Sequence, residues 1–339
     1  MQFGFQPKAR SRISAGLDIG TREMKIVEIS TEEGKPIVTA LGKAAIPSGA
    51  KEDISAALKG LAISSKLNSK DINISVYGPS VITRFLTMPK MSKEEMSGAI
   101  RFEAEKHIPF NINECVTDFQ VLQEYPKDNK SDVLLVAVKR DYVEGRVKAV
   151  REAGFGIGVV DVDGLAVANA FLKNYSQKAS QERTSLLLDI GANITHLAIL
   201  KGQVLRLVRD VSIGSKDFNL AISKVFGVDH NDIEKLKQLL KDKPDEALVP
   251  LRGAMNNLFD EVRLSCSYYE NQCGRNIDDI YISGGGSGID GLPVLFQESF
   301  GVKPECLDPF QAFNIVNFDS PELQKLKSHY AVAVGLAIR

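Results

Sequence analysis

The sequence predicts an α/β fold with two lobes, each containing a mixed sheet and flanking helices. One observation is that strand-like runs alternate with helical runs throughout the 339 residues. The other is that the phrase LDIG occurs twice, at residues 17–20 and 188–191, and a turn and a second strand-like run follow each copy. Because a repeat at half-chain spacing indicates internal duplication, we expect two related lobes that face each other.

Strand-like runs and one helical run open the chain. The strands are predicted from apolar and β-branched residues lying between short turns at 21–23 and 32–34. We expect strands at 16–19, 24–30, 36–46 and 72–76, and a helix at 52–67.

A strand-like run ending in proline and a capped helix come next. Residues 81–89 alternate as a strand does, and Ser92 with Glu95 has the spacing of a capping box at the start of a helix over 92–108. Pro109 ends that helix. We then expect a hairpin from 117–122 and 133–139, a helix at 142–152, a strand at 156–162 and a helix at 165–174.

The stretch 173–185 is the most polar and least periodic part of the chain. We place the main hinge between the lobes there. The strand-rich pattern then returns over 185–210. The remaining elements are expected to be helices at 216–226, 231–240 and 250–273, a strand at 278–283, a glycine-rich loop, and helices at 292–300 and 329–338.

Composition narrows the function classes. The net charge of −1 gives no basic field of the kind that binds nucleic acid, and no apolar run reaches the length of about 18 residues that a membrane span needs. The first 14 residues carry positive charge without an apolar core, so we interpret them as a disordered leader; the alternative is a weak membrane or partner contact through Phe3 and Phe5. The four cysteines form no CxxC pair, which favours reduced thiols in a cytoplasmic protein.

The two LDIG turns carry the chemistry. A carboxylate at the tip of a buried strand is costly unless it meets a cation or donors, and Asp18 and Asp189 both occupy such a position. Gly20 and Gly191 let the backbone approach a ligand closely, and turn N–H groups form a nest for an anion. Two facing copies would clamp a polyphosphate, with a hydrated Mg²⁺ beside the carboxylates. The alternative is that each aspartate only ends a strand as a turn or cap residue.

A glycine-rich loop and a long helix complete the candidate site. The loop, Gly284 to Ser287, follows a strand-like run and precedes a helix, where backbone can pass flat against a ligand. On the helix, Asp260, Arg263 and Ser267 form a polar stripe opposite an apolar face. We expect the stripe to grip a nucleoside opposite the loop, and the alternative is a solvated helix face.

These elements, in this order, resemble the signature of the actin-like ATPase superfamily. GLDIGTREMK (16–25) is similar to its phosphate 1 motif, and LLLDIGANITH (186–196) to phosphate 2. YISGGGSGI (281–289) is similar to the adenosine motif, and VVDVDGLAVANAF (159–171) to connect 1. SHYAVAVGLAIR (328–339) is similar to connect 2, where small residues let two helices cross closely.

The resemblance implies a nucleotide site for ATP and Mg²⁺. It implies that Asp18 and Asp189 hold the metal and that Lys25 and Thr21 contact phosphate, while Asp163 takes the place of a water-positioning acid. Asp18, Asp163 and Asp189 are therefore the candidate catalytic residues. The implied cofactor-binding residues are Gly20, Thr21, Arg22, Lys25, Gly191, Ala192, Asn193, Thr195, Glu261, Arg263, Ser267, Gly284, Gly285, Gly286 and Ser287.

A closer resemblance is to the PilM family, FtsA-like proteins of type IV pilus assembly. It is carried by residues 100–122, which include EAEKHIPF, by 154–171 and by the terminal HYAVAVGLAIR, and it runs from about residue 13 to residue 339. EVRLSCSYYE is similar to a helix of that family, which adds Glu261 as a nucleoside contact. The family implies an actin-like ATPase fold with an FtsA-type 1C subdomain. Its subdomains are 1A (13–89, completed by 157–180 and 326–339), 1C (90–156), 2A (181–214 and 276–325) and 2B (215–275).

The PilM resemblance also implies partners. It implies an ATP-binding cytoplasmic adaptor at the inner membrane face, docked on the cytoplasmic N-terminal peptide of PilN in a groove between 1A and 1C. Phe85, Leu86, Ile100 and Phe102 border that groove, although core packing is the alternative for most of them. The pilus motor ATPases are expected partners, a homo-oligomer or ring is compatible, and membrane contact is expected only through partners.

Two other functions compete with this hypothesis. An FtsA-like filament protein carries a polar linker and an amphipathic helix after connect 2, and we expect no such tether for this protein. A sugar kinase needs an acceptor site, and no sugar-binding pattern occurs, although Asp163 could serve as its base. Ala192 and Asn193 stand where actins often carry a second glycine, so we expect weak or no ATP hydrolysis.

Overall fold

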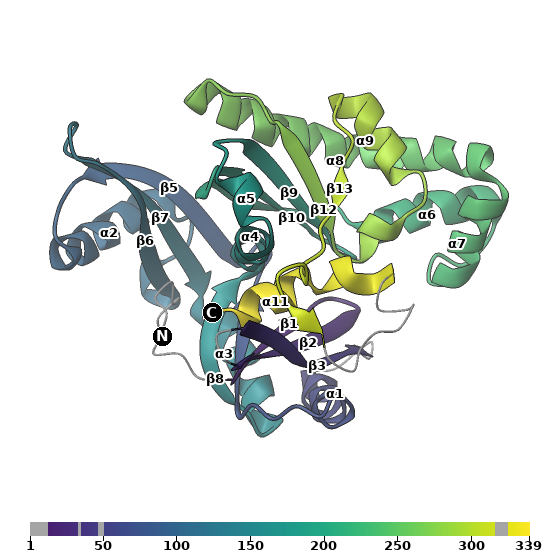
Figure 1. The fold of residues 1–339 in the computed structure, drawn as a ribbon, viewed down its shortest axis with the longest axis horizontal. Helices are drawn as coiled ribbons and strands as arrows, with labels where there is room; N and C mark the ends of the chain where they lie inside the picture. Colours follow the sequence, from purple (N-terminus) through teal and green to yellow (C-terminus); the bar gives the residue numbers. More distant parts are fainter. Residues whose placement is uncertain (1–12, 33–34, 47–50, 316–324) are drawn as a thin grey trace.

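Three sheets organise the molecule. The computed structural model describes residues 13–32, 35–46, 51–315 and 325–339. The first sheet has the strand order β14-β3-β2-β1-β4-β8, the second β11-β10-β9-β12-β13, and the third β5-β7-β6. The expected leader, part of the turn at 32–34 and part of the expected 2A segment lie outside the described residues. In Figure 1 the third sheet lies at the left, the helices of the second lobe at the upper right, and the first sheet below them.

The first sheet and its helices form the first lobe. Helix α1 covers β3, and α11 packs along β1 and crosses α4. Its elements are β1 (Ile13–Ile19), β2 (Glu23–Glu32), β3 (Lys35–Ala45), α1 (Lys51–Ser64), β4 (Asp71–Val76), α3 (Arg140–Glu152), β8 (Gly156–Val162), α4 (Asp163–Asn174), β14 (Asn314–Ile315), η3 (Lys327–Tyr330) and α11 (Ala331–Ala337).

The second lobe repeats the first. In both lobes an antiparallel three-stranded meander continues into two parallel strands, so β3-β2-β1-β4-β8 corresponds to β11-β10-β9-β12-β13. The structure therefore shows the duplication that the repeated LDIG predicts. The elements are α5 (Ser176–Ala179), β9 (Thr184–Ile190), β10 (Thr195–Lys201), β11 (Val204–Val211), α6 (Ser215–Phe226), α7 (Ile233–Asp242), α8 (Pro244–Cys273), β12 (Asp279–Ser283), η2 (Gly285–Gly288), α9 (Leu292–Phe300) and β13 (Glu305–Cys306).

The third sheet is inserted between β4 and α3. Its elements are β5 (Val81–Pro89), α2 (Lys93–His107), η1 (Ile112–Glu114), β6 (Cys115–Tyr125) and β7 (Lys130–Lys139). The predicted capping box is present, since Ser92 Oγ accepts from the Glu95 N–H and the Glu95 carboxylate accepts from the Ser92 N–H. Met96, Ile100 and Ala104 of α2 pack on the strands in a small separate core.

One predicted boundary is wrong for a physical reason. The long helix α8 begins at Pro244, whereas the predicted start was residue 250. Proline is favoured in the first turn of a helix, so both Pro244 and Pro250 fit a helix start, but in the structure Pro250 lies inside α8. The stretch 173–185 joins the lobes without being an open linker, because it contains α5 and the buried Asn174. That side chain donates to the Pro309 carbonyl at 2.7 Å and accepts from the Ala312 N–H at 2.8 Å.

Candidate nucleotide cleft

The two LDIG turns have the same backbone geometry. The Gly20 N–H donates to the Glu23 carbonyl at 3.1 Å, and the Gly191 N–H donates to the Ile194 carbonyl at 2.9 Å. A Cβ on Gly20 would lie 2.9 Å from the Glu23 oxygen, and a Cβ on Gly191 would lie 2.7 Å from the Ile194 oxygen. Any side chain would therefore open either turn, so both positions require glycine.

In each turn the aspartate lies opposite a basic residue of the next strand of the hairpin. Asp18 lies opposite Lys25 in the β1–β2 register, and Asp189 lies opposite His196 in the β9–β10 register. Lys25 Nζ is 3.1 Å from Asp18 Oδ2. Burial alone would lower the pKa of Lys25, but the carboxylate of Asp18 outweighs it and raises that pKa above its usual range. The first turn thus holds a charged ammonium group against a carboxylate.

Asp189 is buried at the end of β9. Ser283, at the end of the neighbouring β12, donates from Oγ to Asp189 Oδ1 at 2.7 Å. Burial raises the pKa of Asp189 to about 6, although His196 and the Ser283 hydroxyl act in the opposite direction. A cation arriving beside this carboxylate would favour its ionised form.

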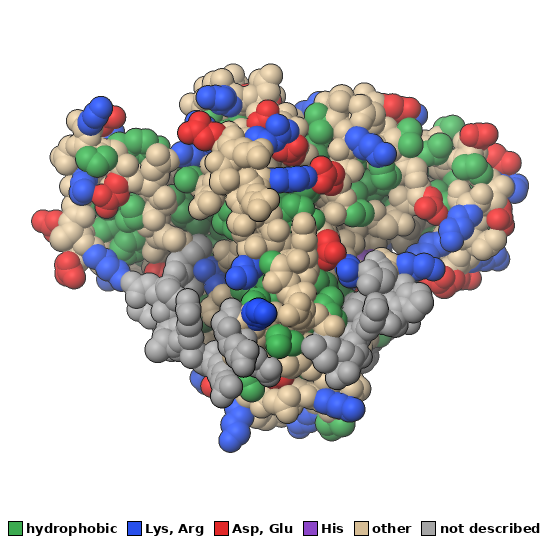
Figure 2. Space-filling model, viewed as in Figure 1, with side chains coloured by type: hydrophobic (Ala, Val, Ile, Leu, Met, Phe, Trp, Pro, Cys, Tyr) green, Lys and Arg blue, Asp and Glu red, His purple; other side chains and the backbone are tan. Residues whose placement is uncertain are grey.

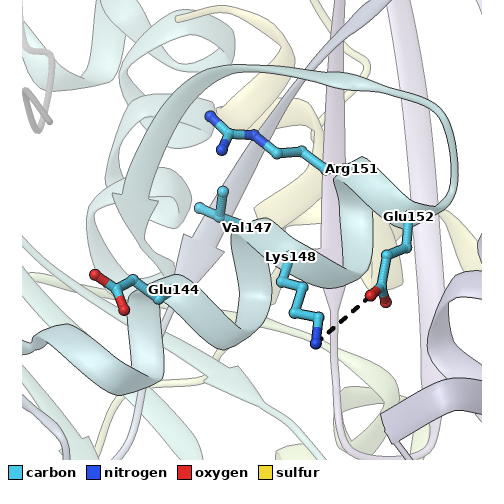
Figure 3. A pocket seen from close by; sticks show the side chains of 5 residues that line it. All are labelled: Glu144, Val147, Lys148, Arg151 and Glu152. Carbon is cyan, nitrogen blue, oxygen red and sulfur yellow. Dashed lines mark ion pairs between the residues drawn. The ribbon is translucent and has the colours of Figure 1, made fainter.

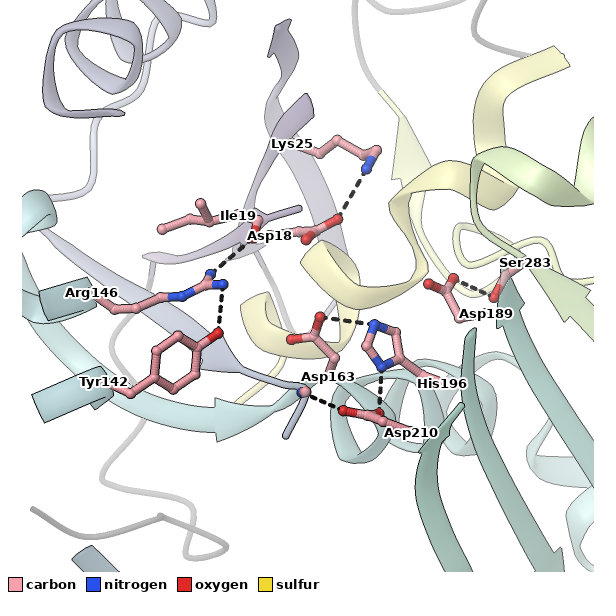
Figure 4. A network of polar contacts seen from close by, with 11 residues as sticks. Asp18, Ile19, Lys25, Tyr142, Arg146, Asp163, Asp189, His196, Asp210 and Ser283 are labelled. Atoms are coloured by element: carbon pink, nitrogen blue, oxygen red, sulfur yellow. Dashed lines mark hydrogen bonds and ion pairs between the residues drawn. The ribbon is translucent and has the colours of Figure 1, made fainter. Parts of the chain in front are cut away.

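His196 joins two further carboxylates (Figure 4). Its Nε2 lies 3.2 Å from Asp163 Oδ2 and its Nδ1 lies 2.7 Å from Asp210 Oδ1, while the Gly78 N–H donates to Asp210 Oδ2 at 2.5 Å. Burial would lower the pKa of His196, but the two carboxylates raise it well above its usual value. Burial raises the pKa of Asp163, against the effect of His196. The network links α4 of the first lobe to β10 and β11 of the second.

His196 is a site residue that the sequence analysis missed. The signal was available in the repeat, because Lys25 follows Asp18 by seven residues and His196 follows Asp189 by the same seven.

Arg146 supports the first turn from outside. Its guanidinium donates to the Ile19 carbonyl at 2.9 Å and to the Tyr142 hydroxyl at 2.9 Å, and it lies over the Tyr77 ring. Helix α3, which follows the third sheet in the chain, is therefore bonded directly to the LDIG turn (Figure 4).

The glycine loop lies against the end of β9, beside the second LDIG turn. Gly284 has a φ of +81°, in the left-handed region that favours glycine, and a Cβ there would lie 2.6 Å from the Ile190 carbonyl oxygen. Gly286 packs on Ile190, while Gly285 is exposed. The Ser287 hydroxyl is used within the protein, because it donates to the Gly284 carbonyl at 2.7 Å. A hollow of about 640 Å³ adjoins the loop and includes Ile289, Pro293 and Val294 in its lining.

Several predicted ligand contacts have other partners in the structure. Thr195 is fully buried and donates to the Ile213 carbonyl at 2.8 Å. The carbonyl of Ala192 accepts from the Lys216 N–H at 2.9 Å, so the second turn is tied to the start of α6. Arg22 reaches from the first turn to Asn231 Oδ1 at 2.8 Å, just before α7. Thr21 and Asn193 are exposed.

The polar residues expected on α8 opposite the glycine loop include two that have charged partners within the protein. Near that loop, Gly291 lies against Leu248 and Leu251 of α8. At a rise of about 1.5 Å per residue, Glu261 lies roughly 15 Å further along the helix and Ser267 further still. Glu261 pairs with Arg209 at 2.6 Å, and Arg263 pairs with Asp260 at 2.8 Å.

The residues expected to border a partner groove divide into core and surface. Ile100 is buried in the core of the third sheet, and Phe85 and Leu86 are partly buried against core residues. Phe102, two residues further along α2, is 68% exposed. Among the four, Phe102 is the side chain that presents a large apolar surface to solvent.

Surface features outside the cleft are weaker candidates for a binding site. A hollow of about 540 Å³ lies along α3, but Glu144, Val147, Lys148, Arg151 and Glu152 of that single helix line it, and Lys148 and Glu152 pair at 3.7 Å (Figure 3). On the face shown in Figure 2, basic and acidic side chains are interspersed rather than gathered by sign.

Within the described ranges there is no group of three or more His, Cys, Asp or Glu side chains that could hold a metal ion. No helix in the described part of the chain is long and apolar enough to cross a membrane.

The donor set nevertheless fits a hydrated magnesium nucleotide. Mg²⁺ in proteins is often held by one or two carboxylates, with water and phosphate oxygens completing its shell, and Asp18 and Asp189 end the two corresponding strands. Lys25 supplies donors for an anion beside them, and the exposed Gly285 leaves space for it.

Comparison with known proteins agrees with this architecture. The family model described as type IV pilus assembly protein PilM matches residues 16–339. A chain of the solved "PilM-PilN type IV pilus biogenesis complex" is 30% identical, with a TM-score of 0.86, over 97% of this chain and 98% of that chain.

More distant structures show the fold alone. The ethanolamine utilization protein EutJ from Carboxydothermus hydrogenoformans is 13% identical, with a TM-score of 0.59, over 97% of this chain and 90% of that one. MreB 5 of Spiroplasma citri bound to AMPPNP is 12% identical, with a TM-score of 0.54, over 97% and 96%. The expected actin-like ATPase fold is confirmed.

Proposed function

The chain belongs to the family of type IV pilus assembly proteins PilM, and from this premise we propose that it is an ATP-binding adaptor of the pilus assembly machinery. In this proposal it binds ATP with Mg²⁺ between its lobes and docks on the cytoplasmic N-terminal peptide of PilN at the inner membrane face. It thereby links that membrane protein to the motor ATPases. The role in pilus assembly follows from the family; the ligand and the docking mode are our proposal.

The main evidence for the proposed nucleotide binding is the pair of corresponding LDIG turns. Asp18 and Asp189 would hold the hydrated Mg²⁺, and Lys25 would face the phosphates. Bound Mg-ATP would supply a cation that shields the phosphate charge and a polyanion that both lobes can grip. The MreB 5 structure with AMPPNP shows that this fold accepts such a ligand in that protein.

We propose that the nucleotide is held rather than rapidly turned over. A water-positioning acid has to meet the attacking water, and one of the two carboxylate oxygens of Asp163 is already paired with His196. The second turn, with Ala192 fastened to α6, also has little freedom to move against a terminal phosphate. Both observations support slow hydrolysis.

A melting experiment tests the nucleotide part. A ligand that binds only the folded chain stabilises it by about 2.7 kcal/mol when present at a hundredfold excess over its dissociation constant. We therefore expect millimolar Mg-ATP to raise the melting temperature by several degrees and ATP with EDTA to raise it less. An unchanged melting temperature with saturating Mg-ATP would overturn this part of the proposal.

The partner part rests on the exposed ring of Phe102. An apolar side chain that is 68% exposed on α2, beside a helix face already packed on the third sheet, offers a contact for an incoming peptide. The match to a chain of the PilM–PilN complex over nearly its whole length supports PilN as the occupant.

Peptide binding tests this part directly. Fluorescence anisotropy with a labelled PilN N-terminal peptide should show a Phe102→Asp variant binding at least about tenfold more weakly, as loss of a contact residue does. Val249→Asp is the matched control, since Val249 is 73% exposed on α8, away from the third sheet. Equal affinity of the Phe102 variant and the wild type would remove α2 from the docking site. Charging Ile100 is a poor test, because that side chain is core.

A further inference from the structure

One polar atom beside the glycine loop has no partner. The Nδ1 atom of His329 is buried and makes no hydrogen bond. Buried polar groups in native proteins are nearly always paired, so an orphaned nitrogen in a cleft calls for an explanation. His329 was not among the residues that the sequence predicted for the site.

The segment that carries His329 is fixed to both lobes. It belongs to η3, which packs against β2 of the first sheet and β12 of the second. The preceding residue, Ser328, accepts from the Gly284 N–H at 3.0 Å, and its hydroxyl lies 3.0 Å from that of Ser287. The position of His329 is therefore set by the glycine loop.

The imidazole ring lies against the exposed part of that loop. A Cβ placed on Gly285 would lie 3.8 Å from Cε1 and 3.9 Å from Nδ1 of His329. Gly285 is exposed whereas its neighbours Gly284 and Gly286 are buried. The unpaired nitrogen thus borders the open face where a ligand would cross the loop.

The charges around the ring come from both lobes. Burial lowers the pKa of His329 to about 4, and Lys25, Lys43 and Lys237 act in the same direction from β2, β3 and α7. The imidazole is therefore neutral at pH 7, with one ring nitrogen as a donor and the other as an acceptor. Each of these ammonium groups is also paired with a carboxylate, of Asp18, Glu23 or Glu234, so the unpaired nitrogen, rather than the net charge, points to a ligand here.

We propose that His329 is a further nucleotide-contacting residue, whose Nδ1–H donates to an oxygen of the nucleotide where it passes over Gly285. This inference deepens the proposed function and rests on it. The contact gives the orphaned nitrogen its partner. It also couples η3, and through it the start of α11, to the presence of ligand.

Titration of the full chain with a fluorescent ATP analogue and Mg²⁺ tests the assignment. His329→Ala should weaken binding about tenfold, the usual loss for one hydrogen bond to a charged ligand. His329→Asn places an amide N–H near the position of Nδ1 and should stay within about threefold of the wild type. His107→Ala, an exposed histidine at the end of α2, is the matched control and should bind as the wild type does.

A second measurement covers the case in which the alanine variant folds poorly. In the wild-type chain, the imidazole NMR signals of His329 should shift on addition of Mg-ATP, while those of His107 stay in place. Equal affinity of the wild type and His329→Ala, or an unmoved His329 signal at saturation, would overturn the assignment alone. Failure of the wild type to bind any nucleotide would overturn the proposed function and this assignment together.

Discussion

The carboxyl group of Asp189 is an acid that the folded protein keeps in an unfavourable place. It is buried at the tip of β9, where the Ser283 hydroxyl donates to it at 2.7 Å. Because burial raises its pKa to about 6, the folded chain resists the ionised form that a metal ligand must adopt. Carboxyl groups whose pKa is shifted in this way are common at functional sites.

The first prediction concerns the Asp189→Asn variant. The pKa of Asp189 is about 6 in the folded chain and its ordinary value is 3.8, so between these pH values the folded state holds a proton that the unfolded state releases. Stability conferred by the wild-type side chain therefore falls as pH rises through this window, by at most roughly 3 kcal/mol. The amide carries no charge and can still accept from Ser283, so the variant should be more stable than the wild type at pH 8 and nearly equal to it at pH 4.

Urea unfolding at both pH values measures this difference. Asp128→Asn, in the exposed β6–β7 turn, is the control for the loss of one carboxylate from the chain. Mg-ATP should stabilise the Asp189 variant less than the wild type, since the proposed metal ligand is lost. A variant less stable than the wild type at pH 8 would show that the carboxylate is favourable where it lies.

Only some of the residues that meet at the cleft could be predicted from the sequence. The repeat predicted both aspartates and both turn glycines at the places where the structure has them. It did not indicate that His196 bridges Asp163 and Asp210, because that contact joins side chains from three elements. The predicted ligand residues Thr195 and Ser287 instead donate to backbone carbonyls, Thr195 to Ile213 after β11 and Ser287 to Gly284 in the glycine loop.

At the scale of elements, the crossing of α11 and α4 holds the first lobe together. Gly335 of α11 packs on the backbone of Ala166 in α4, and Gly16 of β1 lies against the backbone of Ala333. The Asn73 amide donates to the Leu336 carbonyl at 2.8 Å, and the Arg339 guanidinium pairs with the buried Asp161 at 2.5 Å. The small residues of the terminal motif were predicted for this close crossing, and the structure confirms it.

The second prediction tests that crossing with a single methyl group. In Gly335→Ala the new Cβ would lie 1.8 Å from the Ala166 carbonyl oxygen, which is backbone and cannot turn aside. We expect destabilisation of about 1–3 kcal/mol or more, as for other overpacked cores. Gly98→Ala is the matched control, because Gly98 lies within α2 with no atom near its missing Cβ.

The control should change stability in the opposite direction. Alanine is favoured over glycine inside a helix by about 0.5–1 kcal/mol, so Gly98→Ala should stabilise the chain. Urea unfolding of the two variants side by side separates crowding from helix propensity. If both variants were stabilised, the helices could separate at no cost and the crossing would not be close-packed.

Over the whole molecule, the third sheet is bound to the second lobe although the chain attaches it to the first. Thr83 of β5 donates from its hydroxyl to the Val208 carbonyl of β11 at 2.9 Å. Arg206, also on β11, pairs with Asp132 of β7 at 2.9 Å and contacts Gln123 and Tyr125 of β6. The proposed peptide surface on α2 is thereby connected to the lobe that carries Asp189.

This arrangement could not be predicted from the sequence. Hydrophobic periodicity and capping signals identified β5, α2 and the β6–β7 hairpin, because those features are local. Arg206 and Asp132 are 74 residues apart, and neither residue lies in a motif that marks the contact. The same limit applies to α8, where periodicity gave the buried face but not the point at which the glycine loop meets it.

The last prediction is that Arg206 fixes the third sheet to the second lobe. Arg206→Met keeps much of the aliphatic stem but removes the guanidinium from Asp132, whose side chain is only 22% exposed. Removing one partner of a fully buried pair costs about 3–5 kcal/mol and of a surface pair at most about 1, so for this half-buried pair we expect about 1–3 kcal/mol. The Arg252–Glu298 pair, with both side chains about half exposed, supplies the control variant Arg252→Met, which should cost less than about 1 kcal/mol.

Hydrogen exchange locates the effect: amides of β5, β6 and β7 should exchange faster in the Arg206 variant, while those of α8 stay protected. Uniform loss of protection in both lobes would mean that Arg206 supports the whole fold, and unchanged exchange in the third sheet would mean that Thr83 and apolar packing suffice to hold it.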